Sequence, residues 1–146
     1  MKKSKSKINE PKKILVICTG NSARSQIAEG FLKHYKKDWE IYSAGINPKG
    51  LNPMAVEIMS EKGIDISGHK SKHFDLFLNK QFDYVITVCD NARESCPIFP
   101  GNAEYIHWNL KDPAAVEGTK EEKLAAFRKT RDEINYKISE FIKEFL

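Results

Sequence analysis

Short apolar runs alternate along this chain with segments of helical periodicity, and this alternation leaves few folds open. Strand-like runs cover residues 13–17, 39–45, 83–90 and, more weakly, 103–110. Apolar residues recur at helical spacing from Ser22 to Tyr35, over 52–64, and from Thr119 to the end. Strands that alternate with helices form parallel sheets with right-handed crossovers. The sequence therefore predicts an α/β protein with a central four-stranded parallel sheet flanked by helices on both faces.

Local signals mark the ends of two of these helices. Pro53 lies in the first turn of the second helix, and Gly63 stands where that helix should stop. Thr119 is followed three residues later by Glu122, which is the spacing of a capping box. The last helix is therefore predicted to begin at Thr119.

Residues capable of chemistry follow three of the predicted strands. Cys18 comes directly after the first strand, Cys89 lies at the end of the third, and Asp112 follows the fourth. Ligands of open parallel sheets bind beyond the carboxyl ends of the strands. We therefore expect these three residues to converge on one edge of the sheet.

The segment CTGNSAR, residues 18–24, joins the first strand to the first helix. Such a loop presents backbone N–H groups and the positive end of the helix dipole, which together suit a tetrahedral oxyanion. The same field favours the thiolate form of Cys18 as a nucleophile, and the planar guanidinium of Arg24 can bind two oxyanion oxygens. The predicted oxyanion-binding residues are Thr19, Gly20, Asn21, Ser22, Ala23, Arg24 and Ser25.

The residue types inside this loop fit that prediction. Gly20 lets the backbone turn tightly, and Asn21 tolerates left-handed dihedral angles. Ser22 or Ser25 could donate a hydrogen bond to the thiolate. The simpler alternative is a buried cysteine and a surface arginine on an ordinary loop that binds no anion.

The net charge of +4 belongs to the N-terminal arm. Residues 1–13 hold six lysines and one glutamate, a net charge of +5, so the remainder of the chain carries −1. Residues 1–11 are predicted to be a flexible, solubilising arm, with nucleic-acid binding through its lysines as the alternative. We expect no nucleic-acid partner. Residues 12–146 have the size of a single domain.

The rest of the composition narrows the class of protein. No apolar run approaches the roughly 20 residues of a membrane span, and the polar start is no signal peptide, so we expect a cytoplasmic protein without a membrane partner. Three cysteines without repeated spacing argue against a secreted disulfide framework. The four histidines show no metal-ligand spacing with the cysteines, so neither a metal nor a cofactor is predicted.

The segments CTGNSARSQIAEGF (18–31) and SAG (43–45), with the later Asp112–Pro113, resemble the low-molecular-weight protein tyrosine phosphatase family. The resemblance spans nearly all of residues 12–146. More narrowly, the chain resembles the thioredoxin-coupled arsenate reductase branch, in which Arg-Ser-Gln-x-Ala-Glu-Gly commonly closes the loop where phosphatases more often show Arg-Ser-Pro. It implies the phosphatase-like fold, one catalytic domain, and reduction of arsenate to arsenite, with residual phosphatase activity.

Cys89 and Cys96 are seven residues apart, which fits neither a zinc knuckle nor a Cys-x-x-Cys pair. A regular helix would hold the two sulfurs roughly 10 Å apart, whereas a disulfide needs Cα atoms within about 7 Å. Bonding them would require the polar segment between them to bend or unwind. The alternative is one buried cysteine at the end of a strand and one incidental cysteine. The resemblance implies a relay from Cys18 to Cys89 and then Cys96, regenerated by a thioredoxin-like donor.

Asp112–Pro113 is on its own a common turn signal. Near an oxyanion, however, a carboxyl group could protonate a leaving hydroxyl as a general acid, and the resemblance implies this role for Asp112. The phosphatases usually have an aromatic residue after this dipeptide, which helps to hold the phenol of the substrate. Here Ala114 and Ala115 follow, which suits a small inorganic oxyanion.

Two departures from the branch concern the loop. Ala23 stands where many relatives carry a second cysteine, so an intramolecular disulfide of Cys18 must involve Cys89 or Cys96. Some members bind potassium near the loop. The residues that match part of that site are Asn21, Glu29 and Ser43, whereas the region of the other ligands holds Lys70, Lys72 and His73. Cations there argue against potassium binding, and a lysine ammonium could take its place.

Two other functions stay open on the sequence. A phosphatase acting on phosphotyrosine or a small phosphoester would use Cys18, Arg24 and Asp112 without Cys96. A module that binds an oxyanion or a metal without turnover would need only the loop.

Overall fold

The computed structural model describes residues 10–90 and 98–146. Two predictions, the arm over most of its length and the role of Cys96, therefore lie outside the described residues. In chain order the elements are β1 (Lys13–Cys18), α2 (Arg24–Tyr35), β2 (Glu40–Gly45), α3 (Pro53–Ser60), the 3₁₀ helix η1 (Phe74–Phe77), β3 (Tyr84–Cys89), β4 (Glu104–Asn109), the 3₁₀ helix η2 (Pro113–Ala115), α4 (Lys120–Ile142) and the 3₁₀ helix η3 (Lys143–Phe145).

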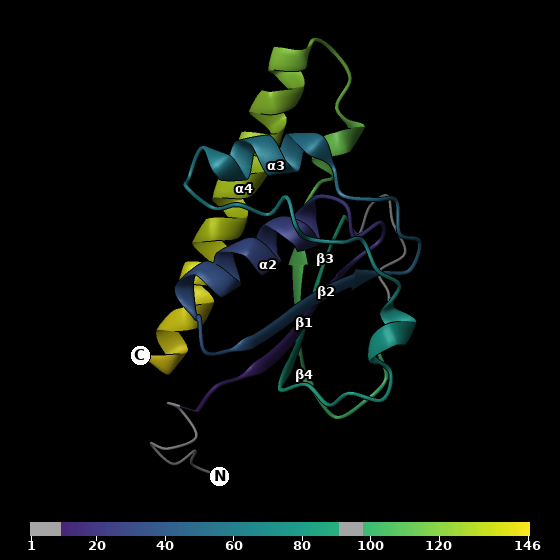
Figure 1. Cartoon of the computed structure of the whole chain (residues 1–146), viewed down its shortest axis with the longest axis vertical. Helices are drawn as coiled ribbons and strands as arrows, with labels where there is room; N and C mark the ends of the chain where they lie inside the picture. Colours follow the sequence, from purple (N-terminus) through teal and green to yellow (C-terminus); the bar gives the residue numbers. More distant parts are fainter. Residues whose placement is uncertain (1–9, 91–97) are drawn as a thin grey trace.

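The four strands form one parallel sheet in the order β2-β1-β3-β4, which confirms the predicted architecture (Figure 1). β1 is central, and its Ile17 lies opposite Ala44 of β2 and Thr87 of β3. The carboxyl ends of β1 and β3 consequently lie next to each other. β1 ends at Cys18 and β3 ends at Cys89.

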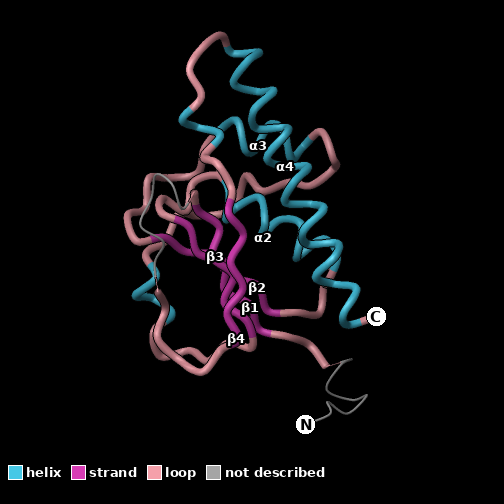
Figure 2. The backbone as a smooth tube through the Cα atoms, turned by 180° about the vertical axis from the view of Figure 1, so that it is seen from behind, coloured by secondary structure: helices cyan, strands magenta, loops and turns pink. Residues whose placement is uncertain are grey.

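Side chains of β1 alternate between two apolar cores. Ile14, Val16 and Cys18 face a cluster that includes residues of α2, α3 and α4, whereas Leu15 and Ile17 face a smaller, aromatic-rich cluster. A strand buried on both faces explains why this stretch is apolar without interruption. Figures 1 and 2 show the three α-helices on one side of the sheet and η1 on the other, so helices cover both faces unequally.

Helix ends follow the sequence signals closely. The side chain of Thr119 accepts from the N–H of Glu122, and the Glu122 carboxylate accepts from the N–H of Thr119, which completes the predicted capping box. Asn52 caps α3 ahead of Pro53. α2 begins at Arg24, two residues later than the periodicity predicts, because residues 19–23 are used by the loop. Among the described residues, no helix is long and apolar enough to span a membrane.

Candidate active site

The loop between β1 and α2 curls around the Cys18 sulfur. Asn21 has a positive φ of 45°, which turns its backbone N–H toward Cys18 Sγ at 3.1 Å. Ser25 Oγ, in the first turn of α2, lies 2.9 Å from the same sulfur. Cys18 is a free thiol, and it is almost fully buried. The Asn21 N–H and the Ser25 hydroxyl hold the sulfur in place at the start of the loop, so the geometry suits the predicted nucleophile.

Gly45, at the end of β2, allows this loop to pack against the sheet. A Cβ atom at this position would lie 2.7 Å from the carbonyl oxygen of Thr19 and 2.8 Å from the amide nitrogen of Asn21. Cβ atoms essentially never approach another atom this closely, so something would have to move. The glycine of the SAG motif is therefore required by the close approach of the loop backbone.

Residues 70–72, which are distant in sequence, brace the loop with hydrogen bonds. The backbone N–H of Lys72 donates to Asn21 Oδ1 at 2.8 Å, and the Ser71 hydroxyl donates to the Gly20 carbonyl at 3.1 Å. Gln26 of α2 donates to the carbonyls of Asn21 and Lys70. Sequence reasoning missed this brace. Gln26 was visible only as part of the arsenate reductase signature, and residues 69–72 carry no periodic pattern.

A cavity of about 480 Å³ opens on the outer side of the loop. The residues that line it are Cys18, Thr19, Gly20, Ser22, Ala23, Arg24, Lys49, Asp90, Lys111, Asp112, Ala114, Ala115 and Val116. The cavity thus brings together the predicted nucleophile, anion-binding guanidinium and general acid. Its lining also includes three charged residues that sequence reasoning did not select: Lys49, Asp90 and Lys111.

The predicted oxyanion-binding set divides between the two sides of the loop. Thr19, Gly20, Ser22, Ala23 and Arg24 line the cavity. The side chains of Asn21 and Ser25 are buried behind it, where Asn21 Nδ2 donates to Ser25 Oγ at 2.8 Å. Their geometry suits support of Cys18 rather than direct binding of an anion.

Arg24 and Asp112 lie close to each other in the lining of the cavity. Arg24 is buried and donates through Nη1 to the Leu110 carbonyl, while its Nη2 lies 3.8 Å from Asp112 Oδ2. The other carboxylate oxygen of Asp112 accepts from the backbone N–H of Ala114 and caps η2. The cap fixes the direction of the carboxyl group. Ala114 and Ala115 then form a wall of small side chains.

The second predicted thiol lies beside the cavity. Cys89 is fully buried at the end of β3, and its neighbour Asp90 lines the cavity. Cys89 is disulfide-bonded in this structure. Cys96 lies outside the described residues.

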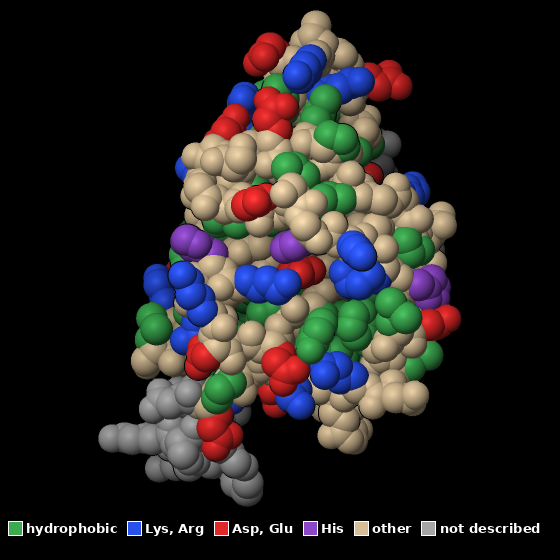
Figure 3. All heavy atoms as spheres, viewed as in Figure 1, with side chains coloured by type: hydrophobic (Ala, Val, Ile, Leu, Met, Phe, Trp, Pro, Cys, Tyr) green, Lys and Arg blue, Asp and Glu red, His purple; other side chains and the backbone are tan. Residues whose placement is uncertain are grey.

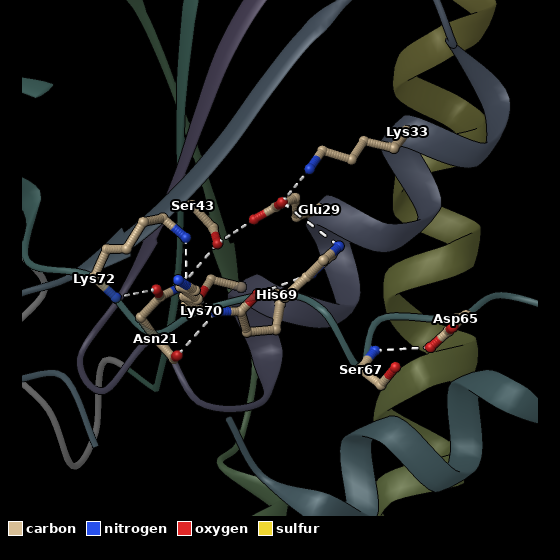
Figure 4. Close-up of polar contacts among 11 residues, drawn as sticks. Asn21, Glu29, Lys33, Ser43, Asp65, Ser67, His69, Lys70 and Lys72 are labelled. Carbon is tan, nitrogen blue, oxygen red and sulfur yellow. Dashed lines mark hydrogen bonds and ion pairs between the residues drawn. The ribbon is translucent and has the colours of Figure 1, made fainter. Parts of the chain in front are cut away.

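Behind the loop lies a polar cluster that includes Glu29, Ser43, His69 and Lys72 (Figure 4). Burial lowers the pKa of His69 below its ordinary value of 6.5, although the nearby Glu29 carboxylate acts in the opposite direction. Burial likewise lowers the pKa of Lys72. Among the described residues, no group of three or more His, Cys, Asp or Glu side chains could hold a metal ion.

Lys33 forms an ion pair with Glu29, in which Lys33 Nζ lies 2.5 Å from Glu29 Oε2. Lys33 lies four residues further along the same helix. Lys72 Nζ instead donates to the Lys70 carbonyl. A lysine that the sequence analysis did not select, Lys33, therefore contacts the carboxylate, and the charge of Lys72 acts on the same carboxylate. Figure 3 shows Lys, Arg and His side chains gathered across the middle of this face, over α2 and β2.

Comparison with known proteins places this chain in a family. A model described as low molecular weight phosphotyrosine protein phosphatase matches residues 13–145. An arsenate reductase of Shouchella clausii is 51% identical over 131 residues, which cover 88% of this chain and 93% of that protein.

Solved structures show the same likeness. An arsenate reductase in the phosphate-binding state superposes with a TM-score of 0.78 at 30% identity, covering 92% of this chain and 99% of that chain. A thioredoxin-dependent arsenate reductase of Corynebacterium glutamicum has a TM-score of 0.69 and 32% identity, covering 96% of this chain and 65% of that chain.

Proposed function

The chain belongs to the low molecular weight phosphotyrosine protein phosphatase family, and on that premise we propose that it is an arsenate reductase with a three-cysteine relay. The observation that carries the proposal is the cavity that Cys18, Arg24 and Asp112 line together, beside the strand that ends at Cys89. The names of the similar proteins supply the substrate, arsenate, and the class of reductant, a thioredoxin.

The first step is attack on arsenic. Arsenate binds against the loop and Arg24, and the Cys18 thiolate forms a sulfur–arsenic bond. One arsenic–oxygen bond breaks, and Asp112 protonates the departing hydroxide so that it leaves as water. Arsenic is still pentavalent at this point. The Asn21 N–H that donates to Cys18 Sγ, and the Ser25 hydroxyl 2.9 Å from the same atom, support this role for Cys18.

The next steps transfer electrons. The Cys89 thiolate attacks the Cys18 sulfur, a Cys18–Cys89 disulfide forms, and the electron pair of the sulfur–arsenic bond stays on arsenic, which leaves as trivalent arsenite. The Cys96 thiolate then attacks Cys89, and Cys18 leaves as a thiolate. A dithiol protein of the thioredoxin class supplies two electrons to the resulting disulfide. A free Cys18 with a disulfide-bonded Cys89 is consistent with the state that precedes this last step.

Phosphate-ester hydrolysis is the second candidate, because the same cavity and the family as a whole fit it. It would need Cys18, Arg24 and Asp112 but no relay. Ala114 and Ala115, where a phosphatase would hold an aromatic ring, favour the smaller oxyanion. Hydrolysis of a simple aryl phosphate is accordingly expected to be slow compared with arsenate reduction.

The decisive experiment replaces Cys96 with serine. We expect Cys96→Ser to lose thioredoxin-coupled arsenate turnover while it keeps hydrolysis of p-nitrophenyl phosphate. The parent protein after one turnover should show Cys89 joined to Cys96 with Cys18 free. Trypsin places the three cysteines on separate peptides, 14–24, 81–93 and 94–111, so mass spectrometry reads the linkage directly.

Three other outcomes would count against the proposal. Unchanged arsenate turnover in Cys96→Ser would exclude the relay. Hydrolysis by the parent protein without arsenate reduction would identify a phosphatase. Binding of phosphate in the loop with no turnover of either substrate would identify a module that only binds oxyanions.

A further inference from the structure

Residues 47–52, between β2 and α3, run alongside the loop that joins β1 to α2. Their backbone N–H groups bind three carbonyl groups of that loop: Asn47 donates to Thr19 at 2.9 Å, Lys49 to Gly20 at 2.9 Å, and Asn52 to Ser22 at 3.0 Å. These contacts fix the two segments against each other. The backbone of Lys49 is therefore held directly beside Gly20.

The side chain of Lys49 extends along the same glycine. A Cβ atom on Gly20 would lie 3.3 Å from Lys49 Cδ, 3.4 Å from Cγ and 3.7 Å from Cβ. Lysine stems commonly cover the protein surface in this way while the ammonium stays in contact with water. Lys49 also lines the cavity that contains Cys18 and Arg24. Because the ammonium is only a short way beyond Cδ, it stays close to the loop.

The charge of Lys49 has no counter-ion in the protein. Among residues 10–90 and 98–146, no carboxylate forms an ion pair with it. Arg24, in contrast, already donates to the Leu110 carbonyl and lies 3.8 Å from Asp112. A lysine ammonium carries three donors and no acceptor, and those of Lys49 are available to an anion in the cavity.

An oxyanion in this cavity needs more than one cation. Arsenate, like a phosphate group, carries more than one negative charge near neutral pH. Asp90 and Asp112 line the same cavity and add negative potential to it. The single charge of Arg24, which also faces Asp112, does not offset all of this. An ammonium held at the loop supplies the missing positive charge.

We propose that Lys49 is a further oxyanion-binding residue, which contacts the substrate oxygen opposite the attacking sulfur. In an in-line displacement that oxygen points away from Cys18 into the cavity. In arsenate or inorganic phosphate it carries charge, whereas in an aryl phosphate it carries the ring. Lys49 therefore favours inorganic oxyanions over their aryl esters. The inference deepens the proposed function and rests on the same cavity and nucleophile.

Replacement of Lys49 by methionine removes the charge and keeps most of the stem. The probe is inorganic phosphate, and the readout is the concentration that halves the rate at which iodoacetamide alkylates Cys18 in the fully reduced protein, measured on tryptic peptide 14–24. We expect this concentration to rise about fivefold, the effect of one partly exposed charge contact. The KM for p-nitrophenyl phosphate should change by less than about twofold, because its outward oxygen is esterified.

Matched variants separate a direct contact from general attraction of anions. Lys49→Arg keeps a positive charge on the same segment and should bind phosphate within about twofold of the parent. Lys111→Met removes a cavity charge that, among the described residues, has no backbone hydrogen bond to the loop. Its effect should disappear at high salt, whereas that of Lys49→Met should persist. Lys129→Met, on the exposed face of α4, controls for net charge, and thermal melts check that each variant is folded.

Three results would overturn the inference. One is a folded Lys49→Met protein with the phosphate affinity of the parent. Another is an equal loss for phosphate and p-nitrophenyl phosphate, and the third is a parent protein whose Cys18 phosphate never protects. If phosphate protects Cys18 but arsenate is not turned over, the proposed function fails, yet the protection measurements still decide the role of Lys49.

Discussion

Asn21 shapes the loop through its backbone conformation and contacts the surroundings of Cys18 through its N–H and its side chain. Among the described residues it alone combines a side chain with a positive φ, and its N–H and amide both serve the region around Cys18. The sequence predicted the left-handed residue, because asparagine tolerates that conformation and stands next to a glycine. It could not predict the brace from Lys72, since nothing local in the sequence encodes a contact across 51 residues.

Gly45→Ala is expected to impair the site without unfolding the protein. The added Cβ would meet Thr19 and Asn21 at under 3 Å, so the loop must move away from β2. A displacement on the order of 1 Å costs about a hundredfold in rate when it misplaces reacting groups. We expect a loss of that order in kcat/KM for arsenate, measured with a thioredoxin system.

Gly68→Ala provides the matched control, because a Cβ there meets nothing within 4 Å and the backbone has no positive φ. It should keep the activity of the parent. Full activity in Gly45→Ala would show that the loop adapts and that the close approach is not needed.

α3 and α4 are joined by an ion-pair cluster around Glu61. Arg128 binds this carboxylate through two nitrogens, and Arg131 donates to it at 2.8 Å while also bonding the Ile58 carbonyl. Hydrogen bonds from Arg128 and then Arg131 lower the pKa of Glu61 to about 2. The cluster fixes the end of α3 against the middle of α4.

This lowered pKa predicts the acid sensitivity of the helical layer. A carboxyl group with a depressed folded-state pKa stabilises the protein above its unfolded value of 4.5 and loses that contribution as the pH falls toward 2. Glu61→Gln should therefore lower the stability to urea at pH 7 and flatten its decline between pH 4.5 and 2. Glu133→Gln serves as the control, and an equally steep acid decline in Glu61→Gln would contradict the assignment.

Helix ends show why some boundaries were predictable. Thr119 and Glu122 are three residues apart, so the capping box is a local pattern and was predicted correctly. α3 ends at Ser60, and Gly63 takes its positive φ of 74° in the turn that follows. The stop signal was right in kind, but it marked the turn rather than the last helical residue.

At the scale of the whole molecule, the sheet could be predicted from the sequence, but the packing of residues on its second face could not. The uninterrupted apolar run of β1 implied burial on both faces, as the two clusters show. The second face is covered by Phe77, Phe82 and Phe99, which come from η1 and irregular segments. Such segments have no period to detect, so their packing becomes visible only when the strands are in place.

The last prediction at this scale concerns the basic N-terminal arm. We propose that residues 12–146 are sufficient for catalysis. The sheet begins after the arm: the Lys12 carbonyl accepts from Glu40, and the Lys13 N–H donates to Asp83. The family match likewise starts at residue 13. Deletion of residues 2–9 should therefore leave kcat/KM for arsenate within about twofold and the melting temperature unchanged.

A full-length variant with Lys2, Lys3, Lys5 and Lys7 changed to serine separates the charge of the arm from its length. If the arm gathers anions, both proteins should lose arsenate affinity at low salt and match the parent at high salt. Salt-sensitive binding of DNA or RNA by the parent, absent from both variants, would identify the arm as a nucleic-acid contact. Either result would replace the assignment of the arm as a solubilising segment, whereas identical behaviour of all three proteins would support it.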